Sequence, residues 1–507
     1  MNQDGGVSCD DRLLFFPEGL TAIRAMRILT LACIIWHVLL VSSVRAEDKK
    51  PNVLFIAIDD MNDWTGFLGG HPEAKTPHMD KLANLGVNFS NAHCSAPGCS
   101  PSRNSLLFGV EPFKSGLYQF YEHKKLPIEL MESYTPLTEF LKDNGYNTYG
   151  SGKIHHRRNA RESEWTEFLP KGKARLKFDA KDGYRQGTST KSNFSPTLNP
   201  LEEHIDYQNT TFGVDVLKRK HDKPFFLAVG LIKPHLPFNA PKQFFDLYPK
   251  DVQPPNIKVG DLDDVPAVGR SMAKISDDIK FTKDKAWTKV RRAYLACNSW
   301  ADHNVGRLLD ALKKSAYADN TIVVLWSDHG YGMGEKRHFR KFALWEITTR
   351  VPFIIWDTRD KTAPKGRKVT NGVSLINIYR TLAEFADLEP PQYVDGFSLV
   401  PQMKDPGKPL PGPAICTWGR GNYTIRNKDW RYTKYYDGTE ELYSHKNDPE
   451  EWNNLALNPE FADIKKQLRA PVPAEEAPLV KAGMERCCRP LSADKPIGGS
   501  KKKNKKQ

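Results

Sequence analysis

The chain has 507 residues, of which 39% are hydrophobic and 27% are charged. This composition is typical of a globular protein with a large core, and it excludes a collagen-like, coiled-coil or mainly disordered chain. The formal net charge is +13, but residues 486–507 hold eight basic side chains and one acidic side chain, which leaves +6 for the rest. The rest of the chain has nearly equal numbers of basic and acidic side chains and no recognisable nucleic-acid-binding motif, so we expect no nucleic-acid partner.

The N-terminal segment has the features of an export signal. Residues 28–44 form an apolar run, with two arginines shortly before it and small residues after it. This order is that of a secretory signal, and seventeen residues that include His37 are short for a membrane span. We therefore expect residues 1–46 to be a signal region, with Met26 as the better start. The mature protein is expected to be secreted or periplasmic, with no stable membrane insertion after cleavage; an uncleaved N-terminal anchor is the alternative.

Apolar runs alternate with helical patterns through the middle of the chain. The expected strands lie at residues 53–58, 225–231, 321–326 and 351–356. The expected helices lie at residues 77–85, 137–144 and 290–313. This alternation predicts an α/β fold with a mostly parallel, mixed central sheet sandwiched by helices. The first and third runs are followed by Asp59-Asp60 and Asp328-His329, at the sheet edge where such folds bind ligands.

The pattern changes after about residue 400. Short aromatic segments separated by turns follow at residues 422–426, 430–436 and 441–443, which predicts a small antiparallel sheet. We expect a main domain over residues 47–400, a small-sheet subdomain over 401–485, and a disordered basic tail over 486–507.

The segment CSPSR at residues 99–103 carries the strongest functional signal. With the residues up to 109 it resembles the C-[ST]-P-S-R-x-x-L-x-x-G motif of the type I, formylglycine-dependent sulfatases of the alkaline-phosphatase superfamily. Phe108 and Val110 depart from the Thr and Arg that are usual there. The resemblance covers nearly all of residues 52–460 and implies an alkaline-phosphatase-like catalytic domain. It also implies that a formylglycine-generating or sulfatase-maturing enzyme oxidises Cys99 to formylglycine, whose hydrated aldehyde is the nucleophile.

The two acidic segments match the metal-binding segments of the same family. Hard carboxylate oxygens suit Ca²⁺ or Mg²⁺, and the resemblance implies Ca²⁺ held by Asp59, Asp60, Asp328 and His329 together with the side chain at position 99. His329 departs from the Asn found in most sulfatases and resembles the iduronate-2-sulfatase branch. A nitrogen ligand is less natural for Ca²⁺ than an oxygen ligand.

The segment GKIHH at residues 152–156 matches the G-K-x-H segment of the family. Lys153 would bind the sulfate or the nucleophile, and a histidine would take a proton from the covalent intermediate so that sulfate leaves. Most sulfatases place this histidine two residues after the lysine, which selects His155. The iduronate-2-sulfatase branch places it three residues after, which selects His156. We favour His155 and keep both.

Three further cations complete the expected site. His235, in the segment KPHLPF at residues 233–238, resembles the histidine that contacts sulfate and protonates the leaving alcohol. Lys341, thirteen residues after Asp328, matches the lysine that assists the leaving group in the iduronate-2-sulfatase branch. Arg103 would hold the nucleophile at position 99 in place on the side that faces the metal.

Together these resemblances predict an exported hydrolase, a sulfatase that cleaves sulfate esters of a sulfated sugar or polysaccharide such as a glycosaminoglycan. Its expected partners are that saccharide and the maturing enzyme. Two alternatives stay open. One is a phosphodiesterase or phosphonate hydrolase of the same superfamily, and the other is a catalytically inactive relative that binds sulfated glycan.

Overall fold

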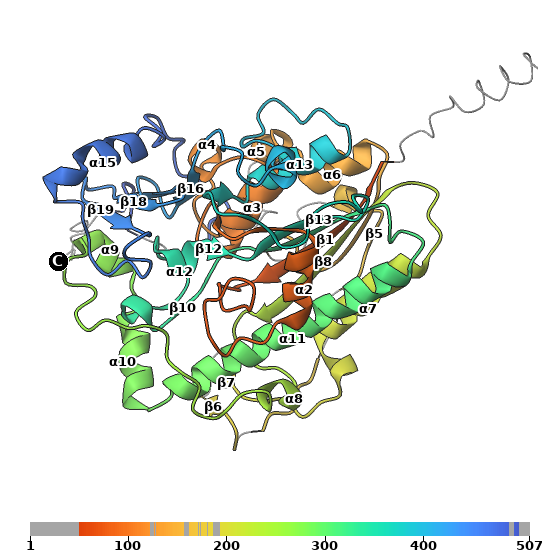
Figure 1. Cartoon of the computed structure of the whole chain (residues 1–507), viewed down its shortest axis with the longest axis horizontal. Coiled ribbons are helices and arrows are strands. Elements are labelled where there is room, and N and C mark those ends of the chain that lie inside the picture. Colours follow the sequence, from red (N-terminus) through yellow and green to blue (C-terminus); the bar gives the residue numbers. More distant parts are fainter. Residues whose placement is uncertain are drawn as a thin grey trace, which may run out of the picture. The chain divides into compact units, whose positions relative to one another are not determined.

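An eight-stranded mixed sheet lies at the centre of the molecule (Figure 1). The structure is a computed structural model that describes residues 50–121, 126, 128–156, 162–170, 172, 174–179, 181–185, 193–485 and 491–495. In spatial order the strands are β14 (Arg367–Val369), β2 (Val87–Phe89), β13 (Phe353–Asp357), β9 (Thr321–Ser327), β1 (Asn52–Asp59), β8 (Phe225–Pro234), β4 (Asn147–Gly152) and β5 (Glu167–Phe168).

Most neighbouring strands of this sheet run parallel. β1 pairs in parallel with both β8 and β9, and β4 pairs in parallel with β8 and β5. β13 is antiparallel to β9 and to β2. The predicted α/β fold with a mostly parallel, mixed sheet is therefore confirmed.

Helices cover both faces of the sheet. The helices are α2 (Pro77–Leu85), α3 (Cys99–Phe108), α4 (Pro112–Ser115), α5 (Ile128–Glu132), α6 (Leu137–Asp143), α7 (Ile205–Lys218), α8 (Lys242–Phe245), α9 (Ala267–Met272), α10 (Ile275–Lys283), α11 (Trp287–Lys314), α12 (Glu346–Thr349), α13 (Asn377–Phe385), α14 (Val400–Lys404) and α15 (Ala462–Arg469). None of those in the described part is long and apolar enough to span a bilayer.

The alternation of side chains along β1 explains the layering. Phe55 and Ala57 pack in the core that includes side chains of α3, α6 and α13, whereas Leu54 and Ile56 pack in the core that includes α2, α7 and α11. Figure 1 shows these two groups of helices on opposite sides of the sheet. Because successive side chains of a strand point to opposite faces, a strand covered on both sides is apolar throughout.

The apolar run expected as one strand at residues 351–356 forms two strands. β12 (Arg350–Val351) pairs with β3 (Ala92–His93), which also pairs with β15 (Val373–Ser374), and β13 begins after Pro352. Proline has no backbone N–H for a ladder, so the chain changes pairing partner at this residue.

Smaller elements complete the fold. A four-stranded antiparallel sheet consists of β16 (Ala414–Thr417), β17 (Tyr423–Arg426), β18 (Trp430–Lys434) and β19 (Glu440–Ser444), which confirms the predicted C-terminal sheet. Two hairpin-like pairs are β10 (Gly332–Met333) with β11 (Phe339–Arg340), and β6 (Tyr184–Arg185) with β7 (Asn193–Phe194).

Both expected terminal segments lie largely outside the described residues. The signal region at residues 1–46 is wholly outside them, and so are residues 486–490 and 496–507 of the basic tail. Residues 491–495 are described: Leu491 O accepts a hydrogen bond from the Asn422 side chain, and the amide of Ala493 donates to Arg420 O. The disorder expected for residues 486–507 stays a prediction.

Candidate active site

The carboxyl ends of β1 and β9 bring the two acidic segments together. Ile58 pairs with Ser327 across the parallel ladder, so the residues that follow each strand emerge at the same edge of the sheet. The backbone amide of Asp60 donates to Asp328 Oδ1 at 3.0 Å. His329 Nε2 lies 3.3 Å from Asp60 Oδ1.

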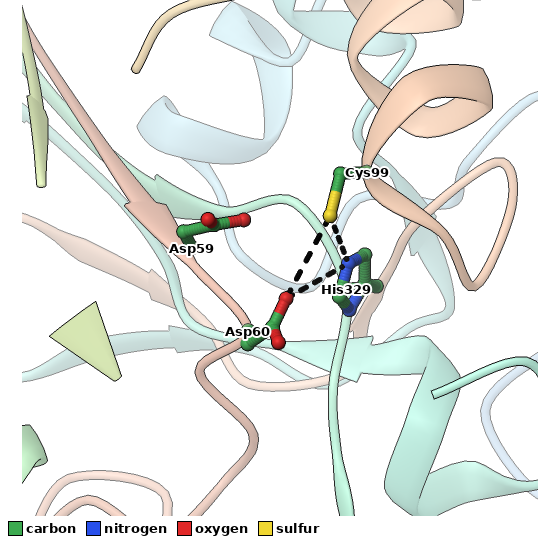
Figure 2. A group of neighbouring side chains, drawn as sticks. All are labelled: Asp59, Asp60, Cys99 and His329. Atoms are coloured by element: carbon green, nitrogen blue, oxygen red, sulfur yellow. Dashed lines mark hydrogen bonds and ion pairs between the residues drawn. The ribbon is translucent and has the colours of Figure 1, made fainter. Parts of the chain in front are cut away.

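Cys99 enters this cluster as the first residue of α3. Its Sγ lies 3.3 Å from His329 Nε2 and 3.7 Å from Asp60 Oδ1. Ligand atoms of Asp59, Asp60, Cys99 and His329 all lie within 4.8 Å of one another. Figure 2 shows the side chains of Asp60, Cys99 and His329 pointing toward a common centre.

The buried acidic groups fit a cation site. The carboxylates of Asp59, Asp60 and Asp328 are each at most 1% exposed, and buried negative charge requires compensation. Asp59 Oδ1 is buried and accepts no hydrogen bond among the described residues, although Nη2 of Arg103 lies 3.5 Å away. Burial disfavours ionised Asp59, but Lys153, with weaker support from His235 and Arg103, lowers its pKa below the usual range. An ionised carboxylate with an unused oxygen is a suitable ligand for a hard divalent cation.

Two lysines shape the surroundings of Cys99. Lys341 Nζ lies 2.8 Å from Cys99 Sγ and 2.7 Å from Asp60 Oδ1, and Lys153 Nζ lies 2.5 Å from Asp59 Oδ2. Burial raises the pKa of the Cys99 thiol, but Lys153 and Lys341 outweigh it and hold this pKa well below its ordinary value. The site therefore stabilises negative charge at position 99.

Arg103 connects three strands beneath the cluster. Its Nε donates to Asp328 Oδ2 at 2.7 Å, and its Nη1 donates to the carbonyl oxygens of Lys153 and Ile154 at 2.6 and 2.8 Å. Its Nη2 donates to Ile58 O at 3.2 Å. The guanidinium is fully buried, so its contacts hold the ends of β1, β4 and β9 in fixed relative positions.

His235 stands at the solvent side of the cluster. Its side chain is 33% exposed, its Nε2 lies 4.0 Å from Asp60 Oδ2, and its Nδ1 lies 2.7 Å from Leu236 O. Burial opposes protonation, but Asp60 and Asp59 outweigh it and raise the pKa of His235. The His235 imidazole therefore stays protonated to higher pH than an ordinary histidine does.

The structure separates the two candidate histidines after Lys153. His155 Nε2 lies 2.7 Å from the buried Glu164 Oε2, which also accepts a hydrogen bond from Thr138. His156 packs against the ring of Phe120 at a centroid distance of 4.9 Å, and its Nε2 lies 3.7 Å from Glu485 Oε1.

Aromatic residues pack on this side of the site, and sequence reasoning had not identified Phe342 or Trp418 among them. Phe120 also contacts Phe342, the residue after Lys341, and Phe342 stacks on Trp418 at 5.1 Å. Trp418 follows β16 of the small sheet, and no local pattern indicates this contact. Ser102 Oγ donates to Asp328 O at 2.5 Å, and its place inside the 99–103 motif was the available signal.

Comparisons with known proteins agree with this geometry. A family model described as Sulfatase matches residues 51–388. A sulfatase of Formosa agariphila is 37% identical over 455 residues, which cover 86% of this chain and 88% of that protein. The human iduronate 2-sulfatase is 28% identical over 391 residues, covering 67% of this chain and 70% of that protein.

A solved structure has the same fold. It is a protein in complex with its substrate D-glucosamine-2-N,6-O-disulfate, and it superimposes with a TM-score of 0.65 at 22% identity, covering 83% of this chain and 96% of that one. Because the family model matches residues 51–388 and a relative is 37% identical over 86% of the chain, this protein belongs to the type I sulfatase family and is a sulfuric ester hydrolase.

Proposed function

We propose that this sulfatase hydrolyses sulfate esters of a sulfated sugar or polysaccharide, with formylglycine made from Cys99 and a bound Ca²⁺ ion. The observation that carries the proposal is the position of Cys99, which faces two aspartates, a histidine and Lys341 at the carboxyl edge of the sheet. When present, formylglycine would supply a hydroxyl nucleophile and Ca²⁺ would supply positive charge beside a sulfate oxygen.

The residues of the acidic cluster would hold the cation. Asp59, Asp60 and Asp328 offer carboxylate oxygens, His329 offers Nε2, and the side chain at position 99 completes the set. Carboxylate oxygens are ligands that Ca²⁺ prefers, and Ca²⁺ tolerates irregular coordination better than Mg²⁺ does. The tolerance of irregular coordination favours Ca²⁺ over Mg²⁺ at this site.

Lysine and arginine side chains prepare the site for a sulfate group. Lys153 follows β4 and Lys341 follows β11, and both side chains reach the acidic cluster. Arg103 holds the ends of β1, β4 and β9 together. Cations that are already in position cost no reorganisation when charge develops on the sulfuryl oxygens. We propose that Lys153 binds the sulfate and that Lys341 stabilises charge on the departing oxygen.

His235 is suited to protonate the leaving alcohol. Its partly exposed ring faces Asp60 from the solvent side, and its pKa is raised above that of an ordinary histidine, so it holds a proton to higher pH. A general acid must hold a proton when the leaving oxygen departs. We propose His235 as this acid.

We propose His156 as the proton acceptor that follows sulfate transfer, in place of the initially favoured His155. His155 is buried and bonded to Glu164, which leaves Nε2 turned into the core. His156 lies against Phe120, whose ring also contacts the residue after Lys341. Phe120 and Phe342 belong to the same buried apolar cluster as Cys99, and this shared packing supports the choice of His156.

The substrate class is proposed from chemistry and from relatives. Among the proposed catalytic cations His235 is the most exposed, and Lys153 is 15% exposed, so a sulfate ester would enter past these two side chains. A relative named iduronate 2-sulfatase and a neighbour bound to a disulfated glucosamine support a sulfated saccharide. We also propose that the protein is exported. Residues 47–400 would form the catalytic domain, and residues 401–485 would form the small-sheet subdomain.

Maturation by a formylglycine-generating or sulfatase-maturing enzyme is also proposed. Cys99 is 0% exposed in the folded chain. An enzyme that oxidises this thiol must therefore reach it before the site closes around it.

The test combines peptide mass spectrometry across residue 99 with a screen of defined sulfated saccharides. We expect an aldehyde at position 99 and sulfate release from at least one saccharide. Parallel assays with a phosphodiester and a phosphonate monoester test the first alternative, because faster turnover of these than of any sulfate ester would overturn the proposal. Saccharide binding without sulfate release from protein carrying the aldehyde would instead support the inactive glycan-binding alternative.

A further inference from the structure

Asp60 has an unusual backbone conformation for a residue in a binding cluster. It follows the last residue of β1 and has a φ of 67°, which lies in the left-handed region. A residue with a Cβ is rarely found there, and it persists where the surrounding structure determines the conformation in several ways. The direction of the Asp60 carboxylate depends on this conformation.

Hydrogen bonds from separate parts of the chain hold the turn. The amide of Asp60 donates to Asp328 Oδ1 at 3.0 Å, and the amide of Met61 donates to Ser327 Oγ at 3.0 Å. On the opposite side, the hydroxyl of Tyr294 donates to Asp60 O at 2.8 Å and accepts from the amide of Asn62 at 2.9 Å. One buried hydroxyl therefore spans the turn and satisfies both backbone groups.

Tyr294 is held firmly by its own surroundings. It lies within the 28-residue helix α11 and is 0% exposed. Its ring packs against Trp64 and Phe238 at centroid distances of 5.7 and 5.1 Å. A rigid helix thus supplies a fixed reference point for the loop after β1.

We propose that Tyr294 is a positioning residue of the metal site. Its hydroxyl fixes the backbone of Asp60, so that the Asp60 carboxylate is directed toward Cys99 and His329. This inference rests on the proposed Ca²⁺ site and adds to it a residue that touches neither the cation nor the substrate. Groups that orient metal ligands contribute to metal affinity without contacting the metal.

Tyr331 provides a matched control. It belongs to the same aromatic cluster, with its ring 5.9 Å from that of Tyr294, and it is 1% exposed. Its hydroxyl has no hydrogen-bond partner among the described residues. Tyr294→Phe and Tyr331→Phe therefore remove the same atom from the same environment, but only the first removes hydrogen bonds to the Asp60 turn.

The experiment measures Ca²⁺ binding to metal-free, full-length protein by calorimetry, together with its thermal unfolding and the Ca²⁺ concentration that half-activates sulfate release. We expect Tyr294→Phe to bind Ca²⁺ about 10-fold more weakly and to need correspondingly more Ca²⁺ for half-activation. Excess Ca²⁺ should restore most of its kcat. Tyr331→Phe should bind Ca²⁺ as the unsubstituted protein does.

The outcomes separate this inference from the proposed metal site. Unchanged Ca²⁺ affinity in Tyr294→Phe would overturn the positioning role alone. Equal loss of affinity in both variants would also overturn it, because the effect would then come from packing in the aromatic cluster. Failure of the unsubstituted protein to bind Ca²⁺ would overturn the metal site and the positioning role together.

Discussion

The ammonium of Lys341 lies 2.8 Å from the sulfur of Cys99, although 242 residues separate the two in the chain. The same ammonium lies 2.7 Å from Asp60 Oδ1, so it stands between the proposed nucleophile and a proposed ligand of the cation. Both the loop after β11 and the N-terminus of α3 must fold correctly to create this contact. The contact between Lys341 and Cys99 therefore forms only when both segments have folded into the site.

Lys341→Met should lower kcat for sulfate esters by about 100-fold or more, because a fixed charge beside the departing oxygen is lost. The loss should be larger for esters of alkyl alcohols than for aryl sulfates, since an acidic phenol needs less help to leave. Steady-state kinetics with the two kinds of ester measure the difference. An equal loss with both would place Lys341 in binding and not in leaving-group stabilisation.

Cys99→Ala should abolish sulfate release while the thermal unfolding temperature stays close to that of the unsubstituted protein. The reason is that no nucleophile can be formed at this position, whereas the removed thiol is small. Cys297→Ala is the matched control, because Cys297 is an equally buried free cysteine outside the metal cluster. Substantial activity in Cys99→Ala would contradict the proposed chemistry.

His156→Ala should lower kcat by about 100-fold or more, as expected for loss of a positioned proton acceptor. His155→Ala should act mainly on stability, because it leaves the buried Glu164 without its imidazole partner. Kinetics and thermal unfolding of both variants separate the two effects. The reverse pattern, with kcat lost in His155→Ala and retained in His156→Ala, would restore the register used by most sulfatases.

Glu111→Gln tests the electrostatics of a buried carboxyl away from the cluster. Burial, and then the nearby Asp395, raise the pKa of Glu111 from 4.5 to about 8 in the folded protein. Between these values the folded state keeps a proton that the unfolded state has released, so rising pH favours unfolding. This contribution to stability is present in full below pH 4.5 and is lost as pH rises to about 8.

Glutamine does not ionise, so the variant should gain stability over the unsubstituted protein by about 1 kcal/mol per pH unit between pH 5 and 8. Urea unfolding of both proteins at several pH values measures this difference. Because all other titrating groups are shared, their effects largely cancel. A difference that does not change with pH would show that Glu111 is ionised in the fold.

Much of the site could be predicted from sequence because its parts are local. The apolar runs before Asp59 and Asp328 identify buried strands, and parallel neighbours place their carboxyl ends at one edge. Helix α2 begins and ends at the expected residues, with Pro77 as its first residue and Gly86 immediately after it. These features depend on short-range backbone preferences, which the sequence carries directly.

Tertiary structure alone decided the features that depend on long-range partners. An apolar run looks the same in a parallel and an antiparallel strand when both faces are buried, so the direction of β13 was open. Adjacent His155 and His156 differ only in what surrounds them. His155 has a fully buried carboxylate 2.7 Å from its Nε2, whereas His156 packs against an aromatic ring and has a less buried carboxylate 3.7 Å from its Nε2. Tyr294 lies 234 residues from Asp60, and only the packing of α11 brings its hydroxyl to that turn. The sequence by itself therefore determined the chemical groups of the site and the sheet edge that holds them, while the fold decided which neighbours orient each group, because those contacts join distant segments.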